Sequence, residues 1–170
     1  MTAFIGIDNG LGGAIAGLNA DGSIAGTWLM PAAKVGKGSE LFPSLLASIL
    51  KQHYGGTVVL ERPTKHAAGI LSLCSTWCCY GGIRAVLELQ QFRVHEVATP
   101  RQWQKTFWAV PKMPKGQKFD TKAAALRVAR QLWPEQSFLA TARCTTPHNG
   151  IVDALLIAEH GRRTLGGTTQ

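Results

Sequence analysis

The chain has 170 residues, of which 45% are hydrophobic and 16% charged, and its mean hydropathy is +0.03. We expect one globular domain spanning residues 1–170, because this length and composition exclude disordered and fibrous proteins. Eighteen Lys and Arg against ten Asp and Glu give a net charge of +8 and an isoelectric point near 9.7, which indicates a polyanionic partner.

The first part of the chain predicts three strands joined by short turns. Asn9–Gly13 is a glycine-rich turn between the first strand and the second. Asn19–Gly22 is a strong turn signal, so the third strand is expected to fold back on the second as a hairpin. The three expected strands are Ala3–Asp8, Ala14–Leu18 and Ser23–Met30.

The rest of the chain predicts alternating helices and strands. Pro31–Gly38 is expected to be a loop, and leucines at helical spacing predict an amphipathic helix that begins at Ser39. Asp120 or Thr121 caps a later helix, which Pro134 stops. The expected segments are a helix Ser39–His53, a strand Thr57–Glu61, a helix Ala67–Leu89 disturbed at Gly81-Gly82, a strand Phe92–Ala98, a helix Pro100–Trp108, a loop Val110–Phe119, and helices Asp120–Trp133 and Asn149–Leu165.

This order of elements predicts an α/β fold. The sheet should be mixed, antiparallel at its start and parallel later, with helices covering it. No stretch approaches the roughly 20 apolar residues of a membrane span, and the segment MTAFIGID lacks the basic start of a signal peptide. The cluster Cys74, Cys78 and Cys79 is expected to hold reduced thiols that fill core volume. We therefore expect a cytoplasmic protein without a membrane partner.

The positive charge is concentrated in one quarter of the chain. Between Arg93 and Arg130, nine Lys and Arg face only Glu96 and Asp120, so this segment carries seven of the eight net charges. Aromatic side chains, among them Trp103 and Trp108, lie in the same segment and could stack on bases or pack under a loop. Basic residues mixed with aromatic ones indicate a nucleic-acid surface, and the alternative is a solvated helix face.

Three carboxylates stand inside or at the ends of apolar segments. Asp8 ends FIGID, Glu61 ends VVLE, and Asp153 interrupts IVDALLIA. A single acid of this kind could be a salt-bridged structural residue, because an ionised acid is rarely buried without a partner. Three such acids from distant parts of the chain are better explained by convergence on a cation. A carboxylate set selects Mg²⁺ or Mn²⁺, and beside a basic surface it indicates two-metal phosphodiester hydrolysis.

Five segments follow one another along the chain: FIGIDNGLGGAIA, VVLERP, ATPRQWQK, a Lys/Gly-rich loop and HNGIVDALLIAEHG. In these segments and their order, the chain resembles the RuvC-type Holliday junction resolvases of the ribonuclease H-like superfamily, particularly small phage and chloroplast members. The resemblance implies a mixed five-stranded sheet, three strands antiparallel and the rest parallel, flanked by helices. It implies a homodimer that cuts two opposed strands of a four-way DNA junction with Mg²⁺ or Mn²⁺. It also places the protein in the cytoplasm of a bacterium or of a phage-infected host, with an organelle as the alternative.

The resemblance assigns catalytic and metal-ligating roles to Asp8, Glu61 and Asp153. The family has a further ligand one helical turn before the last acid, where this chain has Asn149 instead of an acid. Asn149 and Asp153 are four residues apart on one helical face, and an amide oxygen can bind Mg²⁺ without bringing charge. Either this is a natural variant in which His148 helps, or the chain carries a deliberate Asp-to-Asn change that traps substrate uncleaved. We favour the second interpretation.

The resemblance also implies a lysine close to the scissile phosphate. Lys122 fits by its distance from the LWP that ends its helix, whereas Lys118 fits the local Gly-x-Lys pattern, and both stay open as the catalytic lysine. Lys105 matches a family position associated with backbone contact. The nucleic-acid-binding residues expected from the basic segment are Arg101, Lys105, Lys112, Lys115 and Lys118.

Two alternatives to a junction resolvase are kept. One is a different ribonuclease H-like nuclease that acts on branched DNA or RNA with the same strand acids. The other is a protein that binds branched DNA without cutting it, for which Asn149 is the best argument. Cleavage assays on junction, duplex and RNA, with and without Mn²⁺, would separate them.

Overall fold

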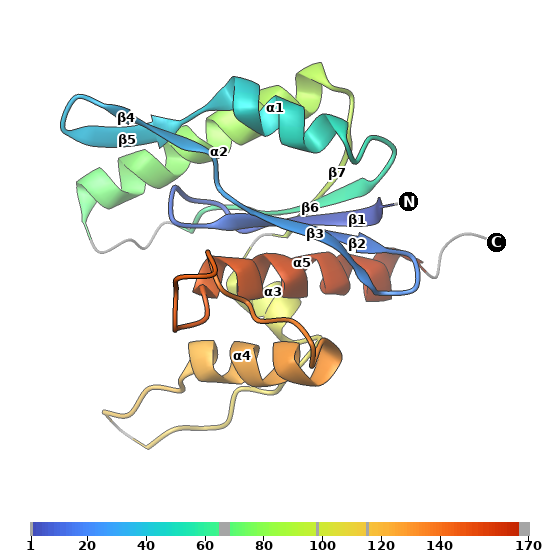
Figure 1. Cartoon of the computed structure of the whole chain (residues 1–170). Helices are drawn as coiled ribbons and strands as arrows, with labels where there is room; N and C mark the ends of the chain where they lie inside the picture. The colour runs from blue at the N-terminus through green and yellow to red at the C-terminus, as the bar shows by residue number, and fades with distance from the viewer. Residues whose placement is uncertain (1, 65–68, 98, 115, 167–170) are drawn as a thin grey trace.

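The computed structural model describes residues 2–64, 69–97, 99–114 and 116–166. A five-stranded sheet runs through it in the order β3-β2-β1-β6-β7 (Figure 1). The bounds of its strands are β1 Thr2–Ile7, β2 Ala14–Asn19, β3 Ile24–Leu29, β6 Thr57–Glu61 and β7 Arg93–Val97. β1, β2 and β3 pair antiparallel, whereas β6 runs parallel to β1 and β7 parallel to β6. The predicted mixed α/β sheet is confirmed.

Helices cover both faces of this sheet. One face carries α1 (Pro43–Lys51) and α2 (Ile70–Leu89), and α5 (Asn149–Leu165) lies along the other, with α3 (Pro100–Gln104) and α4 (Thr121–Leu132) on its side (Figure 1). Because strand side chains alternate between faces, each face has its own core. The isoleucines of β1 and β2 fill the core under α1 and α2, and the alanines of β2 pack against α5.

Small residues bring α5 close to the sheet. A Cβ atom built on Gly6 of β1 would lie 2.1 Å from the carbonyl oxygen of Ala154 and 2.4 Å from the amide nitrogen of Ala158. Only glycine allows β1 to touch the backbone of α5 at this point. The contact fixes Asp153, the neighbour of Ala154, beside the carboxyl end of β1.

Several element boundaries follow the sequence closely. β6 and α5 have the predicted bounds, and α4 begins after Asp120, whose side chain accepts a hydrogen bond of 3.0 Å from the amide of Ala123. α2 is continuous through Gly81 and Gly82, contrary to the expected disturbance. A Cβ on Gly82 would lie 2.7 Å from Cδ2 of Leu41, so this glycine allows a close contact with the neighbouring hairpin.

The segment expected to be a loop at Pro31–Gly38 is instead a hairpin of β4 (Ala32–Val35) and β5 (Gly38–Leu41). Val35 pairs with Gly38, and Gly36 in the two-residue turn has a φ of +58°, which glycine adopts without strain. The helix predicted from Ser39 therefore begins only at Pro43, whose fixed φ suits the first helical position.

Helix α2 corrects two further expectations. It has 20 residues, and its most apolar window has a mean hydropathy of 1.3, so by length and composition it could cross a membrane. Its carboxyl half packs on the sheet through Ile83, Val86 and Leu87, as the covering helix of a globular domain does. Its amino-terminal half extends past the sheet, so Cys74 and Cys78 are exposed and only Cys79 of the cysteine cluster is buried. The predicted residues Ala67 and Ala98 lie outside the described residues.

Candidate metal centre and nucleic-acid interface

The carboxyl ends of two parallel strands bring Asp8 and Glu61 together. Ile7 of β1 pairs with Leu60 of β6, so the next residue on each strand is one of these acids. The backbone N–H of Asp8 donates to the carbonyl of Ala14 at 3.0 Å, which closes the turn that follows β1. Two acids predicted from distant motifs therefore share one edge of the sheet.

A third acid reaches this edge from α5. A Cβ on Gly150 would lie 2.9 Å from the Cα of Gly13, and a Cβ on Gly13 would lie 2.1 Å from the carbonyl oxygen of Asp8. The first turn of α5 thus rests directly on the turn that carries Asp8. Asp153, one turn further along, acts electrostatically on both Asp8 and Glu61.

Among the described residues, little positive charge compensates the three acids. Burial raises the pKa of Asp8 well above its usual range, and the charges of Asp153 and Glu61 raise it further. Burial raises the pKa of Glu61 to about 7, with a smaller contribution from Asp153, although a hydrogen bond from Trp103 opposes the shift. Burial also raises the pKa of Asp153 to about 6, and only the charge of Lys122 opposes it. A cation at this edge would relieve all three.

Trp103 holds one of these carboxylates. Its Nε1 donates a hydrogen bond of 2.6 Å to Oε2 of Glu61, and its side chain is 2% exposed. The ring is therefore part of the core and unavailable for stacking on bases, one of the two roles considered for it. The edge of its ring meets Trp108 at a centroid distance of 6.0 Å.

The donor set suits a hard divalent cation, because carboxylate oxygens are the ligands that Mg²⁺ prefers. Within the described part of the chain, however, no three His, Cys, Asp or Glu side chains lie close enough together to form a ready-made metal site. Mutual repulsion of the acids favours separated carboxylates. Ion binding at this edge therefore requires the carboxylates to approach one another.

Asn149 is the first residue of α5 and is exposed, one turn before Asp153. His148 is the residue that precedes the helix; its side chain makes no capping bond, and its Nδ1 is buried without a partner among the described residues. Nothing in the described contacts places Asn149 against the acids.

The two candidate lysines differ in their relation to the acids. Lys122 lies in the first turn of α4 and lowers the pKa of Asp153 by its charge. Lys118 is exposed in the preceding loop, and among the described residues it has no such effect on the three acids. This asymmetry favours Lys122.

The remaining described basic residues expected to bind nucleic acid, Arg101, Lys105 and Lys112, lie in α3 and in the chain between α3 and α4. Arg101 and Lys105 are exposed one helical turn apart and, with Trp108, line a cavity of about 440 Å³. Lys112 is exposed in the loop before α4, and Lys115 lies outside the described residues. The loop and the start of α4 lie at the same end of the molecule as the start of α5 (Figure 1).

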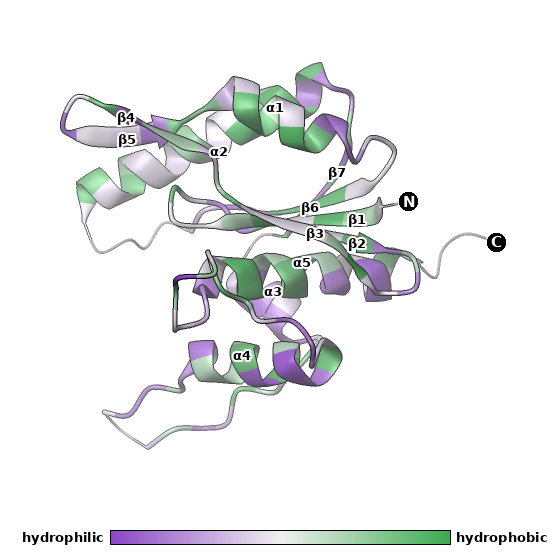
Figure 2. Ribbon diagram, viewed as in Figure 1, coloured by the Kyte–Doolittle hydropathy of each residue, from purple (hydrophilic) through white to green (hydrophobic). Residues whose placement is uncertain are grey.

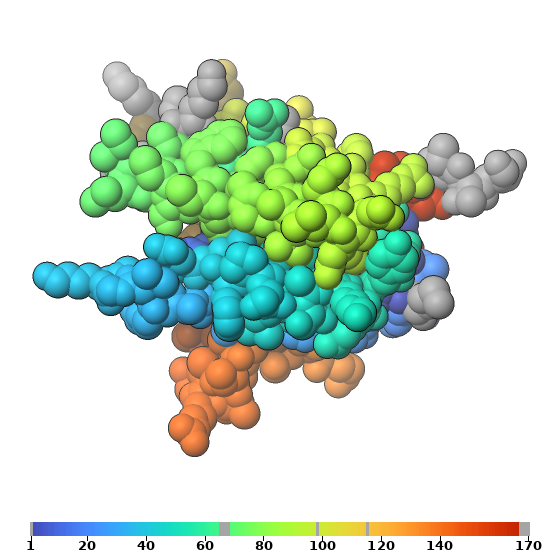
Figure 3. All heavy atoms as spheres, turned by 90° about the horizontal axis from the view of Figure 1, so that it is seen from above, coloured from blue at the N-terminus to red at the C-terminus, as the bar shows by residue number. Residues whose placement is uncertain are grey.

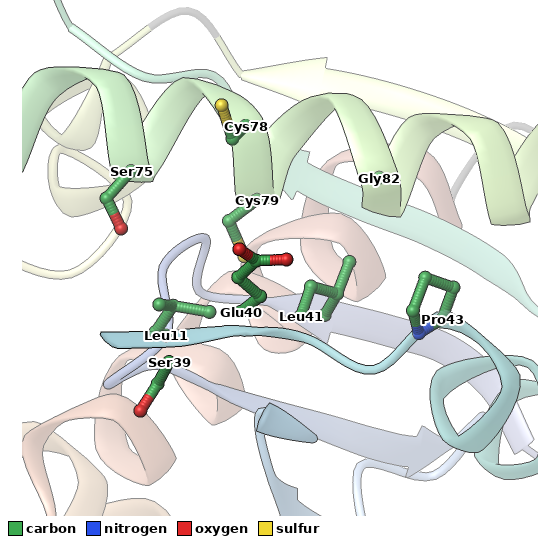
Figure 4. Close-up of a pocket in the computed structure, with 9 residues that line it drawn as sticks. All are labelled: Leu11, Ser39, Glu40, Leu41, Pro43, Ser75, Cys78, Cys79 and Gly82. Carbon is green, nitrogen blue, oxygen red and sulfur yellow. The ribbon is translucent and has the colours of Figure 1, made fainter. Parts of the chain in front are cut away.

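A second cavity, of about 470 Å³, opens between β5 and α2. Figure 4 shows Cys79 pointing from α2 toward Leu11 and Glu40, with Leu41 and Pro43 beside them. None of the three acids lines this cavity, although Leu11 belongs to the turn after Asp8 and Cys79 contacts the backbone of Gly10. It is a neighbour of the carboxylate edge and separate from it.

No protein-family model matches the sequence, and a search of curated proteins finds no similar sequence. Solved structures do match. The structure of Thermus thermophilus RuvC in complex with a Holliday junction substrate superposes with a TM-score of 0.59 over 97% of this chain and 96% of that chain, at 12% identity. The chain has the RuvC fold. A second Thermus thermophilus RuvC structure agrees, with a TM-score of 0.53, 13% identity and 96% of each chain covered.

Two residues that bear on the carboxylate edge are not identified from the sequence. They are Trp103, which bonds Glu61, and Glu159, another acid in an apolar segment. The sequence leaves Trp103 either stacking on bases or packing under a loop and does not connect it with Glu61, although a tryptophan between polar residues of a short helix often buries its ring and needs a partner for its N–H. Glu159 is a fourth acid in an apolar stretch, 2% exposed, and was not counted with the other three. Its signal was the pair of arginines three and four residues later.

Proposed function

We propose that this protein is a Mg²⁺-dependent endonuclease that resolves four-way DNA junctions as a homodimer. The observation that carries the proposal is the convergence of Asp8, Glu61 and Asp153 on one edge of a RuvC-fold sheet, where Lys122 is the one cation among the described residues that acts on any of them. The fold alone would also fit other ribonuclease H-like nucleases. The likeness to a RuvC solved with a Holliday junction supports the choice of substrate.

Asp8, Glu61 and Asp153 would hold the metal ion. Bound Mg²⁺ supplies Lewis acidity toward a phosphodiester and lowers the pKa of water. The chain's own contribution is to position three carboxylates on two strand ends and a helix, and to place the positive charge of Lys122 near Asp153. A lysine there stabilises the negative charge that develops on the phosphate during cleavage.

The basic side chains beside this edge would bind the DNA backbone. Arg101, Lys105, Lys112 and Lys118 are exposed, and no ion pair neutralises them within the described part of the chain. Binding through several phosphate contacts falls steeply with salt, since each contact releases counterions. We therefore expect junction affinity to depend strongly on ionic strength.

Helix α2 is our candidate for the dimer interface. Ile70 is 77% exposed and Leu71 is 83% exposed, and Cys74 and Cys78 continue this surface along the helix. Figure 3 shows α2 in green on the outer surface, beside the blue-green β4–β5 hairpin and α1. Large apolar side chains exposed together are typical of protein interfaces. Tyr80 also lies in α2, but we do not assign its hydroxyl to the interface, because the hydroxyl donates to Glu96 of the same chain.

Junction binding without cleavage is the second candidate function. Asn149 provides no charge where related proteins have an acid, and the described residues form no ready-made metal site. The two functions differ in one prediction. Restoring the charge with Asn149→Asp should raise Mg²⁺-dependent cleavage by orders of magnitude if the protein is a nuclease.

The test is nicking of a labelled immobile four-way junction, with a linear duplex and an RNA hairpin as controls. Paired, symmetric incisions by the Asn149→Asp form in Mg²⁺ or Mn²⁺ are expected, and Asp153→Asn in the same background is the inactive control. If the parent protein and Asn149→Asp both bind the junction tightly but neither cuts it at any concentration of either metal, the protein binds junctions without cleaving them. Preferential cutting of the RNA would favour a different ribonuclease H-like nuclease.

A further inference from the structure

The hydrogen bond between Trp103 and Glu61 links two segments that are 42 residues apart. Trp103 lies in α3, and Glu61 is the last residue of β6, at the carboxylate edge. The indole N–H can only donate, and at 2.6 Å it is in close contact with Oε2 of the carboxylate. A hydrogen bond to an ionised carboxylate is about twice as strong as one between neutral groups.

Packing fixes the donor in place. The ring of Trp103 is 2% exposed, belongs to the core under α5 and meets Trp108 edge to face. A buried ring surrounded by packed side chains has little freedom to rotate, so the direction of its N–H is set by the fold. The carboxylate of Glu61 has to adapt to Trp103 and not the reverse.

We propose that Trp103 is a positioning residue for Glu61 and raises the affinity of the carboxylate edge for a divalent cation. Holding Oε2 leaves Oε1, which has no hydrogen bond in the described part of the chain, to face the ion. Groups that orient a metal-binding side chain in this way commonly change metal affinity by about 10- to 100-fold. The inference rests on the proposed function, because it assumes that Glu61 binds a metal ion.

Two other tryptophans provide matched controls. Nε1 of Trp108 is buried without a hydrogen-bond partner among the described residues, although its ring touches Trp103. Nε1 of Trp133 donates to the carbonyl of Gly22 at 2.9 Å, far from the acids in the sequence. Replacing each tryptophan by phenylalanine removes one N–H and keeps an aromatic ring. Trp103→Phe loses the bond to Glu61, Trp108→Phe loses no bond, and Trp133→Phe loses a bond of purely structural value.

The first measurement is Mn²⁺ binding by electron paramagnetic resonance. We expect Trp103→Phe to weaken Mn²⁺ binding about 10- to 100-fold, whereas Trp108→Phe and Trp133→Phe stay within about twofold of the parent protein. Thermal melting of all three variants separates folding from binding, since Trp133→Phe should lower the melting temperature without changing the affinity. Equal Mn²⁺ affinity in Trp103→Phe and the parent protein would overturn the proposal, whatever their melting temperatures.

The second measurement starts from the unsubstituted protein. Five tryptophans give five indole N–H signals in a ¹H–¹⁵N spectrum, and on titration with Mg²⁺ the signal of Trp103 should shift most. Glu61→Gln should also move this signal, because it replaces the charged acceptor. If the Trp103 signal does not shift with Mg²⁺ while signals of other residues at the edge do, the positioning role of Trp103 is wrong but metal binding is not. A parent protein that binds neither Mn²⁺ nor Mg²⁺ contradicts the metal-dependent function as well, so the two failures are distinguishable.

Discussion

The two halves of α5 carry a half-buried acid, Asp153, and a buried acid, Glu159, with opposite electrostatic surroundings. At the carboxyl end, Glu159 is 2% exposed and accepts hydrogen bonds of 2.6 and 2.8 Å from Arg162 and of 2.7 Å from Arg163. Burial favours a higher pKa for Glu159, but the two arginines outweigh it and lower the pKa below its usual value. At the amino end, the pKa of Asp153 is raised to about 6. Figure 2 shows that α5 is mostly apolar in its first half and more hydrophilic toward its carboxyl end, where the arginines lie.

The comparison shows that burial alone does not identify a functional acid. Glu159 is the more buried of the two and is fully compensated, so it is a structural residue. Asp153 lies beside Asp8 and Glu61, and only the charge of Lys122 opposes the rise in its pKa. An acid whose charge the fold leaves without a partner marks a position where a ligand can supply the missing charge.

The largest expected effect comes from replacing Asp153 by its amide, with the same replacement of Glu159 as the control. In the Asn149→Asp background, Asp153→Asn should reduce junction cleavage on the order of 1,000-fold, because it removes a metal-binding charge. It should leave the melting temperature unchanged or raise it, since an uncompensated buried charge is lost. Cleavage kinetics and thermal melting on the same samples measure both effects.

Glu159→Gln is the matched control at the other end of α5. It should lower the stability by about 1–3 kcal/mol, because the arginines lose their acceptor and the buried amide gains no equal partner. Cleavage by the folded fraction should stay within about twofold of the parent form. If Glu159→Gln abolished cleavage at temperatures where it is folded, the distinction between the two ends would be wrong.

Substitution of Lys122, the lysine near the amino end of α5, should have the next largest effect. We expect Lys122→Ala to reduce cleavage about 100-fold, because the lysine acts on Asp153 and would face the phosphate. Lys118→Ala should reduce cleavage by less than about threefold, and its loss should appear mainly as weaker junction binding at low salt. A reversed order in single-turnover rates would assign the catalytic lysine to Lys118.

Adding a methyl group at each end of α5 tests the packing that positions the acids. Gly150→Ala would place a Cβ 2.9 Å from the backbone of Gly13, so the start of α5 must move away from the turn after β1. Because small displacements of catalytic groups are costly, cleavage should fall about 10- to 100-fold. Single-turnover kinetics at saturating Mg²⁺ measure this loss.

Gly161→Ala adds the same group at the carboxyl end of α5. Its Cβ would lie 2.3 Å from Cγ2 of Val59, and overpacking of this kind costs about 1–3 kcal/mol of stability. Metal affinity and cleavage should survive, since no acid of the edge is displaced. Equal losses of cleavage in the two variants would show that the register of the whole helix, and not its first turn, positions Asp153.

Much of the fold could be predicted because its local signals agree. Turn residues bound β2 and β3, the cap Asp120 marks the start of α4, and the apolar run after Asn149 defines α5. The β4–β5 hairpin could not be predicted in the same way. Its strands have only four residues each, and their stability comes from a glycine turn and from the contact of Leu41 with Gly82 of α2, which is distant in the sequence.

The site was predictable to the same extent. Asp8 and Glu61 each end an apolar strand, and parallel strands bring such ends together, so their proximity follows from topology. Trp103 could not be assigned to Glu61, because the bond depends on how α3 turns after β7. Glu159 could be set apart on the sequence alone, because Arg162 and Arg163 follow it at the spacing that pairs side chains along a helix. The bond from Trp103 to Glu61 joins segments 42 residues apart, so the spacing of residues in the sequence does not reveal it.

The smallest predicted effect is a pH dependence of stability. The unfolded chain loses its carboxyl protons near pH 4, whereas Glu61 and Asp153 keep theirs in the folded protein up to a pKa of about 7 and about 6. The folded state therefore binds more protons across this interval, and stability must fall as the pH rises from about 4 to about 7. In a chelator, the melting temperature should drop by several degrees between pH 5 and pH 8.

Saturating Mg²⁺ at pH 8 should recover most of this loss, because the cation stabilises the ionised acids of the folded state. Asp8→Asn should flatten the pH dependence, since it removes a carboxyl whose own pKa is raised in the folded protein. Glu159→Gln should lower the melting temperature at every pH in this range and keep the slope, because the pKa of Glu159 is already below its usual value. Parallel plots of melting temperature against pH for Asp8→Asn and the parent protein would mean that the acids at the carboxylate edge do not have raised pKa values. The contrast between the two ends of α5 would then be wrong.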